Sequence, residues 1–171
     1  MKIFRVACCL LVVFLSCSNC GYHLSGYGST LPLHIRDISI PVFKNSSNEP
    51  NIQKDATDAI RRAFISDGRL KITDKRKADM VIRGTLTNYQ LRAVSFSSED
   101  SAEEYIVRLG IQVEAYDQIK KKIIFNQKFT TQWDFRSTSS VVDSESAKDI
   151  ALKEAYDDLA DRLVSITIEQ F

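Results

Sequence analysis

The alternation of apolar and polar residues begins just after a segment rich in glycine and serine. Ile38, Ile40 and Val42 alternate with polar or special residues, which predicts a strand over 36–43. Pro41 lies inside this strand and has no backbone N–H to donate. We therefore expect the strand to lie at a sheet edge or to carry a bulge.

A helix is predicted next, over 51–66, because its apolar residues recur at intervals of three and four. These residues are Ile52, Ala56, Ala59, Ile60, Ala63 and Phe64. Asp67 and Gly68 end the pattern, and glycine is suited to the left-handed position that follows a helix. Leu70 and Ile72 then predict a short strand.

Three longer strands follow, over 79–94, 104–117 and 122–135. In the first of them, the apolar positions change parity between Leu86 and Tyr89. A strand has a period of two residues, so its pattern changes phase only where a residue is inserted. The sequence therefore predicts a bulge near Thr87 and Asn88.

The second and third long strands alternate throughout, with one apolar and one polar face. This pattern is typical of an antiparallel sheet covered on one side. Trp133 and Phe135 fall on the apolar side of the third strand, where we expect them to pack in the core. A ligand platform is the alternative interpretation of these two aromatic residues.

The chain ends in a predicted helix over about 144–168, with Ser146 and Asp149 as a capping box. Its apolar stripe is Ala147, Ile150, Ala151, Ala155, Leu159, Leu163 and Ile166. The order of elements predicts an α+β fold, with two helices packed on one face of a mainly antiparallel four-stranded sheet.

The N-terminal residues predict export and a lipid anchor. A basic start, Met1–Arg5, precedes a charge-free apolar run that is too short to span a bilayer. Ser16 and Cys17 then resemble the lipidation site of bacterial lipoproteins. Cys20 is the alternative site, although Asn19 before it fits less well. Two or more acyl chains would hold the protein firmly in a membrane.

This interpretation divides the chain into three parts. Residues 1–16 are expected to be a lipoprotein signal peptide, and 17–34 the lipidated N-terminus and a flexible tether. Residues 35–171 are expected to form one α+β domain.

Composition and motifs argue against several functions. The chain has 23 Lys and Arg against 22 Asp and Glu, so a basic nucleic-acid-binding protein is disfavoured. The two histidines, His23 and His34, have no neighbouring cysteine or carboxylate at ligand spacing, and we expect both to be exposed to solvent. We find no catalytic motif. The sequence therefore predicts no enzyme activity, no cofactor and no metal site.

Two basic runs of the sequence are expected at the same end of the predicted sheet. Lys120, Lys121 and Lys122 lie in the turn between the second and third long strands. Antiparallel pairing brings that turn beside the start of the first long strand, which follows Lys75, Arg76 and Lys77. We therefore expect six positive charges at one end of the sheet, and the acidic Glu99, Asp100, Glu103 and Glu104 at the other. The cluster is interpreted either as two ordinary solvated turns or as a site for phosphate groups, such as those of a glycolipid.

Several segments, in order, resemble the lipopolysaccharide-assembly lipoproteins of the LptE-like family. They begin with Cys20-Gly21-Tyr22-His23-Leu24 and continue with Ile40-Pro41-Val42-Phe43-Lys44-Asn45-Ser46 and Glu49-Pro50. They end with Asp58–Phe64, Ala78–Gly84, Glu104-Tyr105 and a closing helix over Ala147–Val164.

The resemblance implies a two-helix, four-stranded domain that plugs a large outer-membrane β-barrel. That barrel translocates lipopolysaccharide, and the lipoprotein would support its assembly and contact the glycolipid on its way to the outer leaflet. The expected location is the outer membrane, on the periplasmic side and in the barrel lumen. An adaptor or pilot lipoprotein of another outer-membrane assembly, without glycolipid binding, is the alternative, because such a protein would share the fold.

Overall fold

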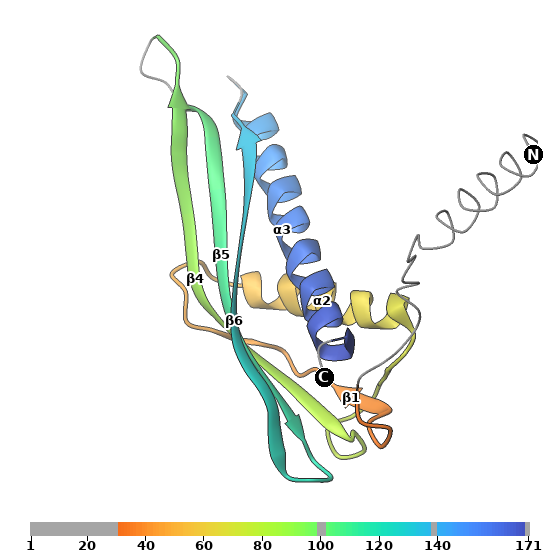
Figure 1. Ribbon diagram of the computed structural model, residues 1–171. Helices are drawn as coiled ribbons and strands as arrows, with labels where there is room; N and C mark the ends of the chain where they lie inside the picture. The colour runs from red at the N-terminus through yellow and green to blue at the C-terminus, as the bar shows by residue number, and fades with distance from the viewer. Residues whose placement is uncertain (1–30, 99–101, 138–139, 170–171) are drawn as a thin grey trace, which may run out of the picture.

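Three long antiparallel strands make up most of the sheet. They are β4 (Met80–Phe96), β5 (Ala102–Asp117) and β6 (Lys122–Arg136). The computed structural model describes residues 31–98, 102–137 and 140–169 of the chain. Within them, β5 lies between β4 and β6 and is antiparallel to both, as the sequence predicts (Figure 1).

A bulge in β4 confirms the predicted change of phase. Leu86 pairs with Ile111 and Asn88 pairs with Gly110, so Thr87 is the extra residue. Leu86 and Tyr89 both stay buried as a result.

A second irregularity, not predicted, lies in β6, where Phe125 pairs with Ala115 and Ile123 with Tyr116. It leaves Ile123 53% exposed.

Three short strands complete a six-stranded mixed sheet, which corrects the prediction of a mainly antiparallel four-stranded sheet, although two of them lie where the strand over 36–43 and the short strand at Leu70 and Ile72 were predicted. They are β1 (Asp37–Ser39), β2 (Lys44–Asn45) and β3 (Lys71–Ile72). The strand β1 is parallel to both β3 and β4, and β2 is parallel to β4. The sequence did not reveal this because parallel pairing depends on distant segments.

Pro41 divides the single strand expected over 36–43 into two. Ser39 pairs with Val81 and Lys44 pairs with Thr85, so four residues of one strand lie opposite three of the other. Proline cannot donate a hydrogen bond to β4, and the ladder is interrupted there. This interruption agrees with the expectation of an edge position or a bulge, because Pro41 lies between the paired segments and β2, which follows it, pairs only with β4 in the described residues.

The helices α2 (Ile52–Asp67) and α3 (Val141–Glu169) pack against the same face of the sheet (Figure 1). Gly68 ends α2 in the left-handed conformation, with φ of 74°, as predicted. The helix α3 begins earlier than expected, and the N–H of Asp143 donates to Ser140 Oγ over 3.3 Å. The Ser146 capping box is therefore wrong, since Ser146 lies inside the helix.

The hydrophobic core lies between the helices and the inner face of the sheet. It joins Ile60 and Phe64 of α2 and Leu159 and Leu163 of α3 to the sheet. Some apolar residues of the predicted patterns lie outside it. Val42 is 52% exposed. Ile150 of α3 is 63% exposed, whereas Ala151, Ala155, Leu159 and Leu163 of the same predicted stripe are buried.

Trp133 is another exception, because it is 36% exposed. Phe135 is partly buried against the core, and its ring stacks on Tyr105 with 5.4 Å between ring centroids. The interpretation of core packing thus holds for Phe135 and only partly for Trp133.

Candidate functional site

The loops that carry the two basic runs meet at one end of the sheet, as the sequence predicts. Gln118, in the β5–β6 turn, donates its side-chain amide to the carbonyl oxygens of Lys75 and Ala78, over 2.9 and 2.5 Å. Its backbone N–H donates to the carbonyl of Asp79 over 2.7 Å. These bonds fix the two loops side by side.

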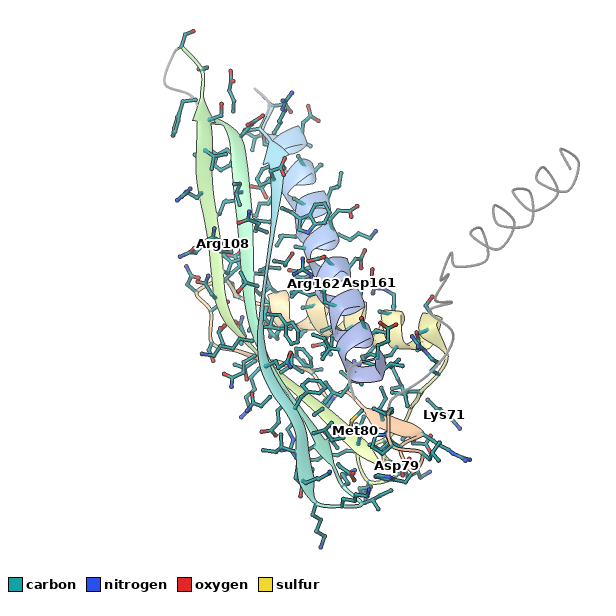
Figure 2. The ribbon with its side chains drawn as sticks, in the orientation of Figure 1. Lys71, Asp79, Met80, Arg108, Asp161 and Arg162 are labelled. Atoms are coloured by element: carbon teal, nitrogen blue, oxygen red, sulfur yellow. The ribbon has the colours of Figure 1, made fainter. Side chains whose placement is uncertain are left out.

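The N-terminal segment is attached to the same end. Asp79 accepts hydrogen bonds from the backbone N–H groups of Arg36 and Asp37, both over 2.9 Å. Figure 2 shows Asp79, Met80 and Lys71 together at this end of the molecule. The segment before β1, the loop before β4 and the β5–β6 turn therefore form one hydrogen-bonded unit.

A buried carboxylate, Asp117, organises the β5–β6 turn. Its Oδ1 accepts the backbone N–H groups of Ile119 and Lys120, over 2.9 and 2.8 Å. Its Oδ2 lies 2.8 Å from His34 Nε2. Burial by itself would raise the pKa of Asp117, but the bonds from the Lys120 amide, His34 and the Ile119 amide lower it below its usual value. The carboxylate is therefore held in its charged form.

His34 differs from the expectation of an exposed histidine, because it is part-buried against Asp117. The two residues are 83 positions apart. No local pattern in the sequence links them, and only the return of β5 to the N-terminal segment brings them together.

All six predicted cations are exposed at the joined loops. Lys75, Arg76 and Lys77 lie in the loop before β4, and Lys120, Lys121 and Lys122 in the β5–β6 turn and at the start of β6. Within the described part of the chain, none of the six forms an ion pair with a carboxylate. We call this group the basic end. Its charge is available to an anion.

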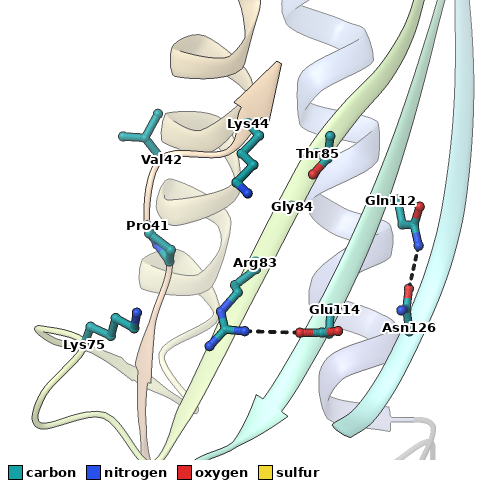
Figure 3. A pocket seen from close by; sticks show the side chains of 10 residues that line it. All are labelled: Pro41, Val42, Lys44, Lys75, Arg83, Gly84, Thr85, Gln112, Glu114 and Asn126. Atoms are coloured by element: carbon teal, nitrogen blue, oxygen red, sulfur yellow. Dashed lines mark hydrogen bonds and ion pairs between the residues drawn. The ribbon is translucent and has the colours of Figure 1, made fainter. Parts of the chain in front are cut away.

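A pocket of about 470 Å³ lies beside the basic end, on the sheet face away from the helices (Figure 3). It occupies the place where Pro41 interrupts the pairing with β4. Its lining combines three cations with polar and apolar groups. The residues are Pro41, Val42, Lys44, Lys75, Arg83, Gly84, Thr85, Gln112, Glu114 and Asn126.

Cross-strand contacts hold the side chains of this pocket. Arg83 Nη1 lies 3.4 Å from Glu114 Oε1, and its guanidinium lies over the Tyr116 ring at 5.6 Å. Gln112 donates to Asn126 Oδ1 over 3.0 Å. Of the residues that line the pocket, the sequence pointed to Lys75 alone as a candidate for contact with an anion. The alternation in β4 and β5 placed Arg83 and Glu114 on the polar face but gave no sign of a pocket.

The outer face of the long strands is mainly polar, although Ile123, which pairs with Tyr116 on this face, is 53% exposed. Arg108, labelled in Figure 2, donates to Gln132 Oε1 over 3.1 Å. Further exposed polar side chains follow along β6: Asn126, Lys128, Thr130, Gln132 and Asp134. This face carries hydrogen-bonding groups in register across strands and is not covered by either helix.

Some predicted features lie outside the described residues. These are Cys17, Cys20, the signal peptide over 1–16, most of the tether, and Glu99 and Asp100. Glu103 and Glu104 do lie at the end of the sheet opposite the basic end, and Glu104 Oε1 is 3.0 Å from Arg136 Nε.

Within residues 31–98, 102–137 and 140–169, no helix has the length and apolar character needed to cross a membrane. The same residues hold no group of three histidine, cysteine or acidic side chains placed to bind a metal ion.

Solved structures share this fold at low sequence identity. A hypothetical protein of Chlamydia trachomatis superposes with a TM-score of 0.58 at 9% identity, covering 78% of this chain and 98% of its own. The minor lipoprotein of Acinetobacter baumannii gives 0.54 at 16% identity, with 80% and 92% covered. Rare lipoprotein B of Shewanella oneidensis gives 0.54 at 16%, with 76% and 92% covered. None of the curated proteins matches the sequence significantly.

The fold and the surface define the class of this protein as a small α+β domain with a basic end and a mainly polar outer sheet face. Its family follows from the sequence. Residues 35–165 match the LptE family, described as lipopolysaccharide-assembly, and the chain belongs to that family. The resemblance noted in the sequence is thereby confirmed. The role of the family is assembly of lipopolysaccharide rather than catalysis.

Proposed function

We propose that this chain is a lipid-anchored outer-membrane protein that plugs the lipopolysaccharide-translocating β-barrel. It would support assembly of the barrel and contact lipopolysaccharide during insertion into the outer leaflet. Membership of the LptE family over residues 35–165 is the observation that carries the proposal. The remaining parts of the proposal rest on the chemistry of the surface.

The anchor would be a diacylglyceryl group on Cys17, with Cys20 as the alternative, after removal of residues 1–16. The tether over 17–34 would then lead to the domain, and its last residues pack against the domain, since Leu31 is buried and His34 contacts Asp117. Mass spectrometry of the mature N-terminus tests this part. An unmodified N-terminus that retains the signal residues would refute the anchor.

The polar outer face supports the proposed location in a barrel lumen. The core is already covered by α2 and α3, so the sheet face of β4, β5 and β6 is free for a partner. That face presents amide, hydroxyl and charged groups, of which Arg108 and Gln132 are an example. A water-filled lumen lined by polar side chains would match it better than an apolar surface would.

The basic end is our candidate for contact with lipopolysaccharide. Lys75, Arg76 and Lys77, together with Lys120, Lys121 and Lys122, present ammonium and guanidinium groups without carboxylate partners in the described chain. Such groups bind phosphate through charge-assisted hydrogen bonds. The phosphorylated head of a glycolipid has the matching chemistry.

Co-purification tests the plug. The tagged mature protein should be extracted with a mild detergent from a cell that expresses it, and its partners identified by mass spectrometry. We expect a stoichiometric outer-membrane β-barrel. A monomer without a barrel would contradict the proposal, and a different envelope assembly in its place would favour the adaptor alternative.

Charge reversal tests the glycolipid contact separately. Glutamate at Lys120, Lys121 and Lys122 should weaken binding of lipopolysaccharide to the purified protein while leaving the barrel complex intact. Glutamate at Lys54, Arg62 and Lys153, three exposed cations of α2 and α3 away from the basic end, is the matched control. Unchanged binding in the basic-end variant would remove this contact from the proposal and leave the plug.

A further inference from the structure

We propose that the pocket lined by Lys44, Lys75 and Arg83 binds a phosphorylated sugar. The inference deepens the proposed function, because it assigns a ligand class to a pocket beside the basic end. It rests on that function only for the source of the sugar, which would be a glycolipid. The pocket's binding of a free sugar phosphate can be measured on its own.

The first argument is charge. Three cations and one carboxylate line the pocket, so its formal net charge is +2. The carboxylate, Glu114, already contacts Arg83 over 3.4 Å. Lys44 and Lys75 form no ion pair within the described residues. Two ammonium groups therefore lack a partner on this surface, and a phosphate dianion would supply one.

The second argument is the arrangement of the three cations (Figure 3). They come from three separate segments, namely β2, the loop before β4, and β4 itself. Figure 3 shows Lys44 and Lys75 on one side of the pocket, and Arg83 lying toward Glu114 on the other. Arg83 is also held over the Tyr116 ring at 5.6 Å. An anion between these segments would be contacted from two sides.

The third argument is that the pocket wall is fixed before any ligand arrives. The guanidinium of Arg61, on α2, donates twice to the carbonyl of Ile40, over 2.7 and 3.0 Å. Thr57 Oγ1 accepts the backbone N–H of Phe43 over 3.0 Å. The Phe43 ring itself packs against Gly84, where a Cβ atom would overlap it. The segment that bears Pro41 and Lys44 is thus attached to the core, which lowers the entropic cost of binding.

The remaining lining favours a sugar over a bare anion. The pocket volume of about 470 Å³ exceeds the need of a phosphate group. Thr85, Gln112 and Asn126 offer hydroxyl and amide groups to sugar hydroxyls, and Pro41 and Val42 offer an apolar wall to a ring face. The Gln112–Asn126 hydrogen bond of 3.0 Å leaves further donors and acceptors on both amides free to bind a ligand.

Nuclear magnetic resonance titration of the mature lipoprotein tests the proposal. The protein would be labelled with ¹⁵N and held in a polyoxyethylene detergent, which carries neither sugar nor phosphate. Glucose 6-phosphate is the probe, and glucose and inorganic phosphate are the comparison ligands. We expect saturable shifts of the Thr85 backbone amide and of the Gln112 and Asn126 side-chain amides. Glucose should give none, and inorganic phosphate should bind more weakly.

Variants locate the site. Lys44→Gln combined with Arg83→Gln should weaken binding of glucose 6-phosphate by about tenfold or more, because two charge-assisted hydrogen bonds are lost. Arg108→Gln removes a cation from the same sheet face outside the pocket and should leave binding unchanged. Preserved chemical-shift dispersion in each variant shows that it is folded.

Three results would overturn the proposal. They are the absence of saturable shifts, equal binding of inorganic phosphate and glucose 6-phosphate, and equal weakening by Arg108→Gln. Loss of the barrel in the co-purification experiment would refute the plug instead, and the titration would still stand. The two proposals can therefore fail independently.

Discussion

His34 Nε2 lies 2.8 Å from Oδ2 of Asp117, whose side chain is fully buried. The contact joins the segment that precedes β1 to the turn that carries Lys120 and Lys121. Because the same carboxylate also accepts two backbone N–H groups of the turn, one side chain fixes both the entry of the chain into the domain and the shape of the basic end.

We expect strong thermodynamic coupling between these two residues. Asp117→Ala should lower the free energy of unfolding by roughly 2–4 kcal/mol, because two part-buried turn amides and the histidine lose their acceptor. His34→Ala should cost less, about 1 kcal/mol, since the turn amides keep theirs. A double-mutant cycle, measured by urea denaturation, should give a coupling energy above about 0.5 kcal/mol.

The cycle has an internal control in Arg136 and Glu104. This pair has a similar distance, 3.0 Å, but is exposed, with 84% of the arginine side chain accessible. Exposed pairs contribute little. If the coupling energy of His34 and Asp117 were as small as that of the exposed pair, the buried contact would not stabilise the fold.

The pH dependence of stability should reflect the ionisation of the Asp117 carboxylate. The pKa of Asp117 is lowered on folding, so the unfolded state binds the proton more tightly. The charged carboxylate therefore makes its full contribution to the free energy of unfolding above the pKa that it has in the unfolded state, near pH 4. This contribution is lost as the pH falls through the folded pKa. We expect the difference in unfolding free energy between wild type and Asp117→Asn to shrink on acidification. A difference that grows toward low pH would contradict the assignment.

Gly84 should tolerate no side chain while Phe43 is present. A Cβ at Gly84 would overlap the Phe43 ring, which is buried. Gly84→Ala should therefore destabilise the protein by about 1–3 kcal/mol, the usual cost of overpacking. Because the clash is with one ring, the double variant Gly84→Ala/Phe43→Leu should be less destabilised than the sum of the two single variants. Strict additivity in urea denaturation would locate the strain elsewhere.

At Gly68 a side chain would have space, but the backbone conformation would be strained. Its φ is 74°, and a Cβ there would meet no atom within 4 Å. Gly68→Ala should cost about 1 kcal/mol through left-handed strain alone. Gly68→Asn should cost less, because asparagine adopts this conformation more readily. Equal losses for the two variants in thermal unfolding would argue against a conformational cause.

Deletion of single residues should distinguish the β4 bulge from the regular strand. Thr87 is the extra residue between Leu86 and Asn88, so its deletion restores regular alternation and keeps Tyr89 facing the core. Deletion of Thr85 would instead turn Leu86 toward solvent. We expect the Thr85 deletion to lower the urea midpoint much more than the Thr87 deletion. The reverse order would show that the bulge itself is needed for folding.

Local patterns in the sequence were sufficient for the regular elements. The parity change between Leu86 and Tyr89 predicted the bulge at Thr87, and Gly68 predicted the end of α2. Antiparallel pairing of neighbouring strands also predicted that Lys75 and Lys120 would lie at the same end. These predictions succeed because strand period, helix capping and hairpin pairing each depend on residues close in the chain.

The tertiary structure decided everything that joins distant segments. The pairing of β3 with β1 and the division of the first strand into β1 and β2 gave six strands where a four-stranded sheet was expected. The exposed Trp133 could not be distinguished from a core residue by alternation alone. Likewise, the contact of His34 with Asp117 and the pocket beside Pro41 depend on residues brought together by the sheet. The sequence by itself determined the two helices, the three long strands and the family. Only the tertiary packing decided which polar side chains of different elements contact each other, because the same local pattern is compatible with many long-range neighbours.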